Sequence, residues 1–398
     1  MKQAAKLSTF FSLYLAQAVP LSLFSTLLPV IMRQGSFSLS AIGLLQLIKL
    51  PWILKFLWAP LVDQKTTGLK SFKKWIIGSE LVYALLVFSI ALLDLKLNFY
   101  LIFVLILLSF FASATQDIAT DALAALSFNK KERGRGNSMQ SMGSFAGTFI
   151  GAGLLMMLYK EIGWTVLLGG LATFLVLALW PIMRYRDEDL TYRKIPTRTS
   201  ISDIGRFFRQ QGGFRQLVFL LLFQVGMIGI LAMYKPFLVD YGLGLKEIGL
   251  MFGVFGPLFG IFSSFSGGYI LRKISRYSAK LLVSGLMVMV PLLFWSLTLI
   301  TPEKTLLYGF VAYMWTVYGF ASVLINTVSM DFLRSGREGT DFTLQTVLVQ
   351  FSSMLMAVLS GTLADHLSYS GLALIEVGLA MLSLIYLIFF GKTTEHAE

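Results

Sequence analysis

The stretch NFYLIFVLILLSFFASATQDIATDALAALS, residues 98–127, decides the fold class. Its first 19 residues carry no formal charge, and roughly 20 consecutive apolar residues are what an α-helix needs to cross a bilayer. The charged residues, Asp117 and Asp121, come late in the stretch. The stretch therefore predicts a membrane-spanning helix that carries two carboxylates.

Apolar stretches of similar length recur along the whole chain of 398 residues. Only 14% of the residues are charged and 56% are hydrophobic, whereas a soluble domain has about a quarter of its residues charged. We therefore predict an all-α polytopic protein whose exterior faces lipid. The twelve predicted spans are residues 7–31, 39–62, 75–93, 98–127, 137–159, 162–184, 214–240, 246–271, 278–300, 304–333, 339–366 and 370–391.

A polar stretch divides these spans into two sets of six. It covers residues 185–213 and contains Pro196 and several Ser and Thr residues, which is typical of a linker. The predicted organisation is an N-terminal six-helix bundle (1–184), a cytoplasmic linker (185–213) and a C-terminal six-helix bundle (214–398). Such repeated halves are expected where two bundles move about a site near the middle of the membrane.

The basic residues predict the orientation of the chain. With the N-terminus in the cytoplasm, 25 of the 33 Lys and Arg residues fall in cytoplasmic segments and 5 in outer loops. This bias follows the positive-inside rule, so both termini are predicted to be cytoplasmic. The formal charge of +12 is then a topology signal, and we expect no nucleic-acid binding.

The residue inventory excludes most catalytic and metal chemistry. The chain has no cysteine and two histidines, His366 and His396, so thiolate metal sites, disulfides and cysteine nucleophiles are ruled out. No phosphate-binding loop, dinucleotide fingerprint or nucleophile elbow is present. We therefore expect no enzymatic activity, no metal site and no cofactor.

The loop at residues 59–74 resembles the signature loop between helices two and three of the major facilitator superfamily. Asp63 is its acidic member, but Ala59 stands where the first glycine is usual, so the match is partial. The resemblance implies that Asp63 helps to latch the cytoplasmic side shut. A carboxylate there also fits against a helix N-terminus or against loop arginines such as Arg133 or Arg135. The alternative is that Asp63 only solvates the end of a loop.

Longer strings narrow the resemblance. They stand at residues 13–20 (LYLAQAVP), 50–60 (LPWILKFLWAP), 116–121 (QDIATD) and 339–345 (GTDFTLQ). Together they resemble the group that contains AmpG-type muropeptide permeases, acetyl-CoA transporters and rhizobactin/pyochelin-type siderophore permeases, and the siderophore permeases most of all. The resemblance implies proton-driven import of an amphiphilic molecule across the bacterial inner membrane.

The two carboxylates of residues 98–127 are the candidates for proton coupling. Asp117 and Asp121 lie one helical turn apart and share a face, and two carboxylates so placed in a low dielectric resist being ionised together. The alternative is that they pair with Lys55 or with loop arginines and stay charged.

Further residues are candidates for the substrate cavity. Ionisable groups such as Lys55 cost roughly 2.5–3.5 kcal/mol each at bilayer depth and usually face water or a partner, while aromatic and amide side chains suit a ligand with apolar rings and hydrogen-bonding groups. For some of them helix packing or a position at the membrane surface is the competing interpretation, above all for Trp315, Tyr318 and Lys235. The candidates are Tyr14, Gln17, Lys55, Gln116, Gln224, Lys235, Trp315, Tyr318, Asn326 and Gln345.

Three functions remain open on the sequence alone. The leading hypothesis is a monomeric, proton-coupled importer of a siderophore-like small molecule. The second is a muropeptide permease of the AmpG type, although a sugar cavity is expected to offer more hydrogen-bonding groups. The third is a membrane receptor that transports nothing.

Overall fold

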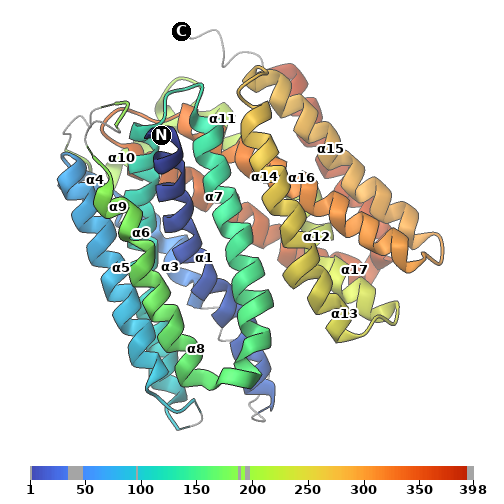
Figure 1. Ribbon diagram of the computed structural model, residues 1–398. Coiled ribbons are helices and arrows are strands. Elements are labelled where there is room, and N and C mark those ends of the chain that lie inside the picture. The colour runs from blue at the N-terminus through green and yellow to red at the C-terminus, as the bar shows by residue number, and fades with distance from the viewer. Residues whose placement is uncertain (1, 35–47, 96, 187–189, 193–197, 392–398) are drawn as a thin grey trace. The chain divides into compact units, whose positions relative to one another are not determined.

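The computed structural model describes residues 2–34, 48–95, 97–186, 190–192 and 198–391, and their regular structure is entirely helical (Figure 1). Ten helices within these residues are long and apolar enough to cross a membrane by length and composition. The predicted all-α polytopic fold is confirmed, and the count of twelve spans stays a prediction.

Contacts between residues divide the chain into two compact units. Unit 1 comprises Met1–Asp203 together with Phe332–Leu344, and unit 2 comprises Ile204–Asp331 and Gln345–Glu398. The segment Phe332–Leu344 therefore packs with the first half of the chain, although it lies far along the second. The boundaries of the predicted linker, at residues 185 and 213, stay a prediction.

Unit 1 contains the long helices that correspond to predicted spans one, three, four, five and six. The fifth and sixth spans are separated at Gly163, whose φ of 73° is left-handed, a conformation that glycine adopts without steric cost. The elements are α1 (Lys2–Gln34), α5 (Leu69–Ala91), α6 (Phe99–Ser127), α7 (Arg133–Thr148), the π-helix η3 (Phe149–Leu155), α8 (Met156–Ala178) and α9 (Trp180–Arg184).

The second predicted span, 39–62, lies partly outside the described residues. Its described part is three short pieces, α3 (Leu50–Leu54), the 3₁₀ turn η2 (Lys55–Leu57) and α4 (Ala59–Lys65). Pro51 and Pro60 stand in the first turns of α3 and α4, where the missing N–H is tolerated but the preceding helix cannot continue. The prolines therefore place Lys55 on a turn between two helices.

Close packing of α7 and η3 against α1 depends on glycines. A Cβ added at Gly143 would lie 2.8 Å from the Cβ of Tyr14, and one at Gly151 would lie 2.4 Å from the carbonyl oxygen of Val19. Small residues at such positions let helix backbones approach closely. The contact fixes α1, and with it Tyr14, beside α7.

This contact predicts a large effect of a single substitution. A Cβ at Gly147 would lie 2.3 Å from the Cβ of Ala18, so Gly147→Leu should destabilise the folded protein by at least the roughly 1–3 kcal/mol typical of overpacking. Gly170→Leu is the matched control, because a Cβ at Gly170 meets nothing within 4 Å. Thermal unfolding in detergent should show a lowered midpoint for Gly147→Leu only; equal midpoints for the two variants would contradict the packing.

Unit 2 contains the remaining long helices. The predicted eleventh and twelfth spans form α17, in which Ser368 has a φ of 64° and separates two helical parts. The elements are α10 (Ser202–Arg209), α11 (Gly213–Leu222), α12 (Val225–Asp240), α13 (Leu245–Leu250), the π-helix η5 (Met251–Phe255), α14 (Gly256–Ile270), α15 (Arg276–Thr298), α16 (Lys304–Asp331) and α17 (Glu338–Phe390). The first residues of α10 and of α17 belong to unit 1, and the rest of both helices belongs to unit 2.

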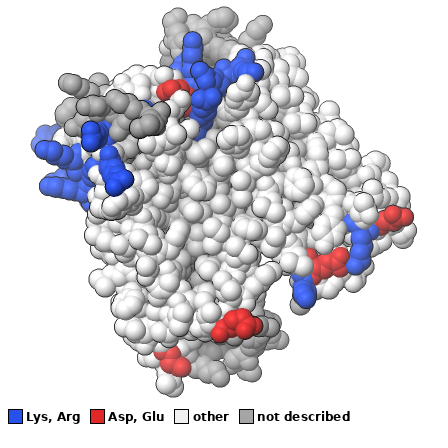
Figure 2. Space-filling view, in the orientation of Figure 1, with Lys and Arg blue, Asp and Glu red and all other residues white. Residues whose placement is uncertain are grey.

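The surface has the distribution expected of a protein in lipid. Large apolar side chains point outward from the helices, for example Leu85 (64% exposed), Leu177 (67%) and Phe262 (72%). Figure 2 shows a broad area of uncharged residues in the middle of the view, and the Lys, Arg, Asp and Glu residues lie toward its margins. Because helices satisfy their own backbone hydrogen bonds, this exterior can contact hydrocarbon along its length.

Candidate functional site

One face of α6 is polar where the helix is buried. Ser113, Gln116, Asp117, Thr120 and Asp121 recur at spacings of three and four residues, and each is at most 3% exposed. Residues at these spacings lie on the same side of a helix. The predicted common face of Asp117 and Asp121 therefore points into the interior of unit 1.

Asp117 forms a buried ion pair with Lys55. The ammonium nitrogen of Lys55 donates a hydrogen bond to Oδ2 of Asp117, and the two side chains are 2% and 4% exposed. The same ammonium lies 5.3 Å from the centre of the Trp52 ring. The 3₁₀ turn η2 thus presents Lys55 to α6, and the carboxylate compensates the charge that burial would otherwise make costly.

Asp121 is held by neutral donors from two other helices. The hydroxyl of Tyr14 on α1 donates to Oδ1 at 2.7 Å, and Nε2 of Gln140 on α7 donates to the same oxygen at 3.3 Å. Oδ2 is buried and has no hydrogen-bond partner among the described residues. One oxygen of Asp121 is therefore fixed by two donors, and the other is open in the sense that it is buried and accepts no hydrogen bond from the described residues.

A pair of amides completes this cluster. Nε2 of Gln17 on α1 donates to Oε1 of Gln116, while Nε2 of Gln116 and Oγ1 of Thr120 find no hydrogen-bond partner in the described part of the chain. We call Tyr14, Gln17, Lys55, Gln116, Asp117, Asp121 and Gln140 the buried cluster. Six of these seven residues were predicted from the sequence, and the structure brings them together.

The charges of the buried cluster suit it to bind one proton. Two carboxylates face a single ammonium group, so full ionisation leaves one uncompensated negative charge in a low dielectric, which is costly. One proton on Asp121 makes the buried cluster neutral while the Lys55–Asp117 pair stays intact. The arrangement can therefore exist in two states that differ by one proton.

A second polar site lies at the start of α17, within unit 1. Asp63 is 2% exposed and accepts hydrogen bonds from the backbone N–H of Gly339 at 3.1 Å and of Thr340 at 2.6 Å. The hydroxyl of Thr340 donates to the same carboxylate at 2.6 Å. The carboxylate caps a helix N-terminus, where the helix dipole favours negative charge. Arg133 and Arg135 begin α7, and their part in a latch stays a prediction.

Ion pairs surround this N-terminus. Arg334 donates through Nε and its backbone N–H to Oδ2 of Asp341, at 2.8 and 2.9 Å, and Arg337 pairs with Asp203 at 2.9 Å. Burial lowers the pKa of Arg334, but its hydrogen bonds with Asp341 and the charges of Asp341 and Asp203 outweigh burial and raise the pKa above its ordinary value. The segment Phe332–Leu344 is thus anchored in unit 1 by charge as well as by the Asp63 cap.

The candidates of unit 2 do not form one hydrogen-bonded cluster in the described residues. Trp315 packs flat on Gly256, where an added Cβ would lie 2.4 Å from the indole nitrogen, and its ring meets Tyr318 edge to face at 6.3 Å. Gln345 accepts from Nε2 of Gln216 at 2.8 Å and donates to the carbonyl of Ser329 at 3.0 Å. For Trp315 and Gln345 these contacts favour a role in helix packing.

Three further candidates belong to α12 and α16: Lys235 lies on α12, Gln224 directly precedes α12, and Asn326 lies on α16. Lys235 is exposed, with its ammonium 4.8 Å from the ring centre of Phe252. Gln224 is 7% exposed and directly precedes α12, and Asn326 is half-buried on α16. Their role in a cavity stays a prediction.

Sequence reasoning missed several residues of both sites. Gln140 is not among the residues predicted from the sequence, and Thr340 and Asp341 appear there only as part of the string at residues 339–345. Asp203, within the polar stretch at residues 185–213, carried no signal apart from its charge. Thr340 and Asp203 gain their roles through contacts across more than a hundred positions of chain, to Asp63 and Arg337, and Gln140 reaches Asp121 from a different helix; residue spacing within one helix encodes none of these contacts.

The chain matches a family model described as the Major Facilitator Superfamily over residues 10–355. It belongs to this superfamily. The prediction of a polytopic membrane transporter rather than an enzyme is therefore confirmed.

Curated relatives in the superfamily carry AmpG-type names, in agreement with the resemblance found in the sequence. The anhydromuropeptide permease of Escherichia coli K12 is 22% identical over 394 residues, which cover 96% of this chain and 79% of the permease. The putative transporter AmpG 4 of Rickettsia felis is 22% identical over 97% of each chain, and its counterpart in Rickettsia conorii is 24% identical over 71% of each.

Solved structures show the same fold at lower identity. A bacterial homologue of the iron transporter ferroportin, in an outward-facing state, matches with a TM-score of 0.70 at 16% identity over 98% of this chain and 99% of that one. The human organic anion transporter TETRAN matches with a TM-score of 0.74 at 15% identity over 96% and 99%. The major facilitator fold thus extends over nearly the whole chain.

Proposed function

We propose that this chain is a proton-coupled importer of an amphiphilic organic molecule that carries amide groups, and that the buried cluster couples the proton to the cargo. One observation carries the proposal: Asp121 is buried beside the Lys55–Asp117 pair with one oxygen open. A proton on Asp121 neutralises the cluster, and a bound cargo that donates a hydrogen bond to the open oxygen favours one protonation state over the other. Proton binding and cargo binding are linked in this way.

The cargo class has two candidates. The names of the curated relatives support an anhydromuropeptide, which offers peptide amides and sugar hydroxyls to Gln17 and Gln116. The strings at residues 116–121 and 339–345 support a siderophore-like molecule, which offers amides together with larger apolar groups.

The proposal places the chain in the bacterial inner membrane as a monomer with both termini in the cytoplasm. The orientation is supported by the distribution of 25 basic residues against 5, and the bacterial inner membrane by the AmpG-type names of the relatives. On this orientation Asp63 and the start of α17 lie on the cytoplasmic side, where a carboxylate that caps a helix can act as a latch. Loss of the Asp63 contacts is the step that frees the start of α17 from the rest of unit 1.

Uptake by proteoliposomes tests the proposal. The purified protein should accumulate one of two radiolabelled cargoes, a ferric siderophore or an anhydromuropeptide, when the inside is alkaline, and dissipation of the gradient should abolish accumulation but leave counterflow. Accumulation of the muropeptide alone would exclude the siderophore assignment, and the reverse result would exclude the muropeptide. Binding of both without counterflow would overturn the transporter assignment in favour of a receptor.

A further inference from the structure

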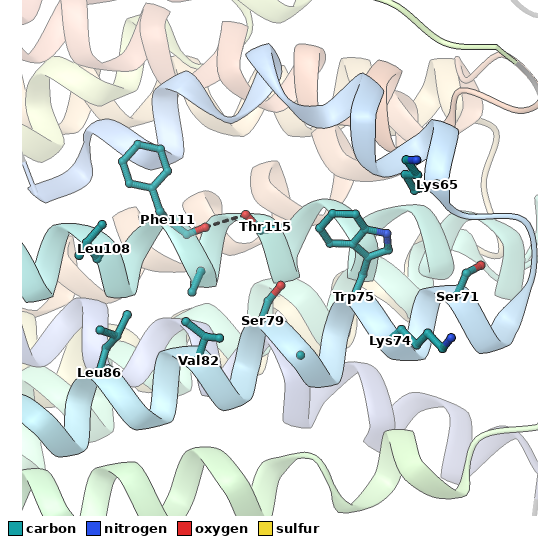
Figure 3. A pocket seen from close by; sticks show the side chains of 12 residues that line it. Lys65, Ser71, Lys74, Trp75, Ser79, Val82, Leu86, Leu108, Phe111 and Thr115 are labelled. Carbon is teal, nitrogen blue, oxygen red and sulfur yellow. Dashed lines mark hydrogen bonds between the residues drawn. The ribbon is translucent and has the colours of Figure 1, made fainter.

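A lateral groove of unit 1 lies between α5 and α6 and is closed at one end by α4 (Figure 3). Its volume is about 840 Å³. The lining residues are Lys65, Ser71, Lys74, Trp75, Gly78, Ser79, Val82, Leu86, Leu108, Phe111, Ala112 and Thr115. All of them belong to unit 1 and none belongs to the buried cluster.

The groove changes from basic to apolar along its length. Lys65 and Lys74 stand at one end, near Ser71 and Trp75, and Leu86 and Leu108 stand at the other (Figure 3). The polar atom of Thr115, in the middle, is occupied: its hydroxyl accepts from Nε1 of Trp58 at 3.1 Å and donates to the carbonyl of Phe111 at 2.8 Å. Beyond the basic end the wall is therefore mainly hydrocarbon, with the hydroxyl of Ser79 as its remaining polar group.

The two lysines at the basic end are available to a ligand. Both are exposed, and among the described residues neither ammonium has an ion-pair or hydrogen-bond partner. Nearby Lys73, in contrast, donates to the carbonyl of Met183. Two unpaired cations at the mouth of an apolar groove fit an anionic group joined to an apolar chain.

The length of the groove matches one leaflet of a bilayer. From Lys74 to Leu86 the axis of α5 rises roughly 18 Å, at about 1.5 Å per residue, whereas half of the hydrocarbon core is roughly 15 Å thick. Basic pockets between membrane helices on the cytoplasmic side bind anionic head groups, and the predicted orientation places the lysines on that side. Trp75 next to them has the position of an interfacial aromatic anchor.

We propose that this groove is a binding site for one anionic phospholipid, with its phosphate between Lys65 and Lys74 and an acyl chain along Val82, Leu86 and Leu108. The lipid packs α4 against α5 and α6 from the membrane side. The site is separate from the buried cluster, so it does not depend on which cargo is transported.

Lipid titration of the purified full chain in detergent tests the site. Native mass spectrometry should show that the protein retains phosphatidylglycerol in preference to phosphatidylcholine. Lys65→Gln with Lys74→Gln should weaken the apparent affinity for phosphatidylglycerol about 25-fold, because each surface lysine contributes roughly fivefold to binding of anionic lipid. The matched control, Lys70→Gln with Lys131→Gln, removes two exposed charges outside the groove and should leave the affinity unchanged.

A second variant tests the apolar part of the groove. A Cβ at Gly78 meets nothing within 4 Å, so Gly78→Leu fills the groove without a clash and should displace the lipid, while Gly170→Leu should not. If the Lys70/Lys131 control lost as much affinity for phosphatidylglycerol as the Lys65/Lys74 variant, the effect would be one of general electrostatics and the proposal would be overturned. Equal retention of phosphatidylcholine, or full retention in both Lys65/Lys74 and Gly78 variants, would also overturn it.

Discussion

Lys55→Met should be among the most damaging single substitutions in this chain. It leaves the carboxylate of Asp117 buried without a cation, which typically costs about 3–5 kcal/mol, and it should abolish uptake. Thermal unfolding in detergent and uptake by proteoliposomes measure the two effects. Lys70→Met is the matched control, because Lys70 is an exposed lysine of unit 1 outside the buried cluster, and the stability of this variant should differ from that of the unmodified protein by no more than about 0.5 kcal/mol.

The double variant Lys55→Met with Asp117→Leu separates stability from function. Replacement of a buried ion pair by apolar residues of similar volume is often neutral or stabilising. We therefore expect the double variant to recover most of the stability lost in Lys55→Met and to remain unable to transport. Additive losses of stability would contradict the pairing, and recovery of transport would contradict a functional role for it.

Asp63→Asn should loosen the start of α17. Hydrogen bonds to a charged acceptor contribute roughly 1.5–3 kcal/mol, so loss of the charge should raise the population in which Gly339 and Thr340 leave Asp63 by about 10- to 100-fold. Because the chain has no cysteine, a single Ala122→Cys reports this opening. Ala122 is 1% exposed, and its Cβ would lie 3.4 Å from a Cβ at Gly339.

The measurement is the rate at which a maleimide modifies Cys introduced at position 122. The rate should rise in the Asp63→Asn background and stay at its starting value with Glu161→Gln, which removes an exposed carboxylate elsewhere in unit 1. An unchanged rate in Asp63→Asn would show that this carboxylate does not hold the segment.

The membrane helices were predictable because their signal is local. Hydrocarbon thickness requires a minimum length of apolar residues, and residues 98–127 satisfy it without reference to any other part of the chain. The breaks in the second span were harder to predict from composition. Pro51 and Pro60 interrupt the helix, but the apolar composition continues through both prolines.

The candidate site was predictable only in part. The shared face of Asp117 and Asp121 follows from helical spacing, and Lys55 was named as one possible partner. Two other contacts depend on tertiary packing. Tyr14 donates to Asp121, which lies 107 residues away in the sequence. Asp63 accepts from Gly339 at the N-terminus of α17, which lies 276 residues away. Spacing along the chain carries no information about such distances.

Coupling through Asp121 is the central claim, and proton-driven accumulation in Asp121→Asn tests it most directly. For one proton per cargo, a gradient of about one pH unit supports up to roughly tenfold accumulation, since it is worth about 1.4 kcal/mol. Asp121→Asn should lose this accumulation and keep counterflow. Glu80→Gln, which alters a buried carboxylate of α5 outside the buried cluster, should keep both. Full accumulation by Asp121→Asn would contradict the account.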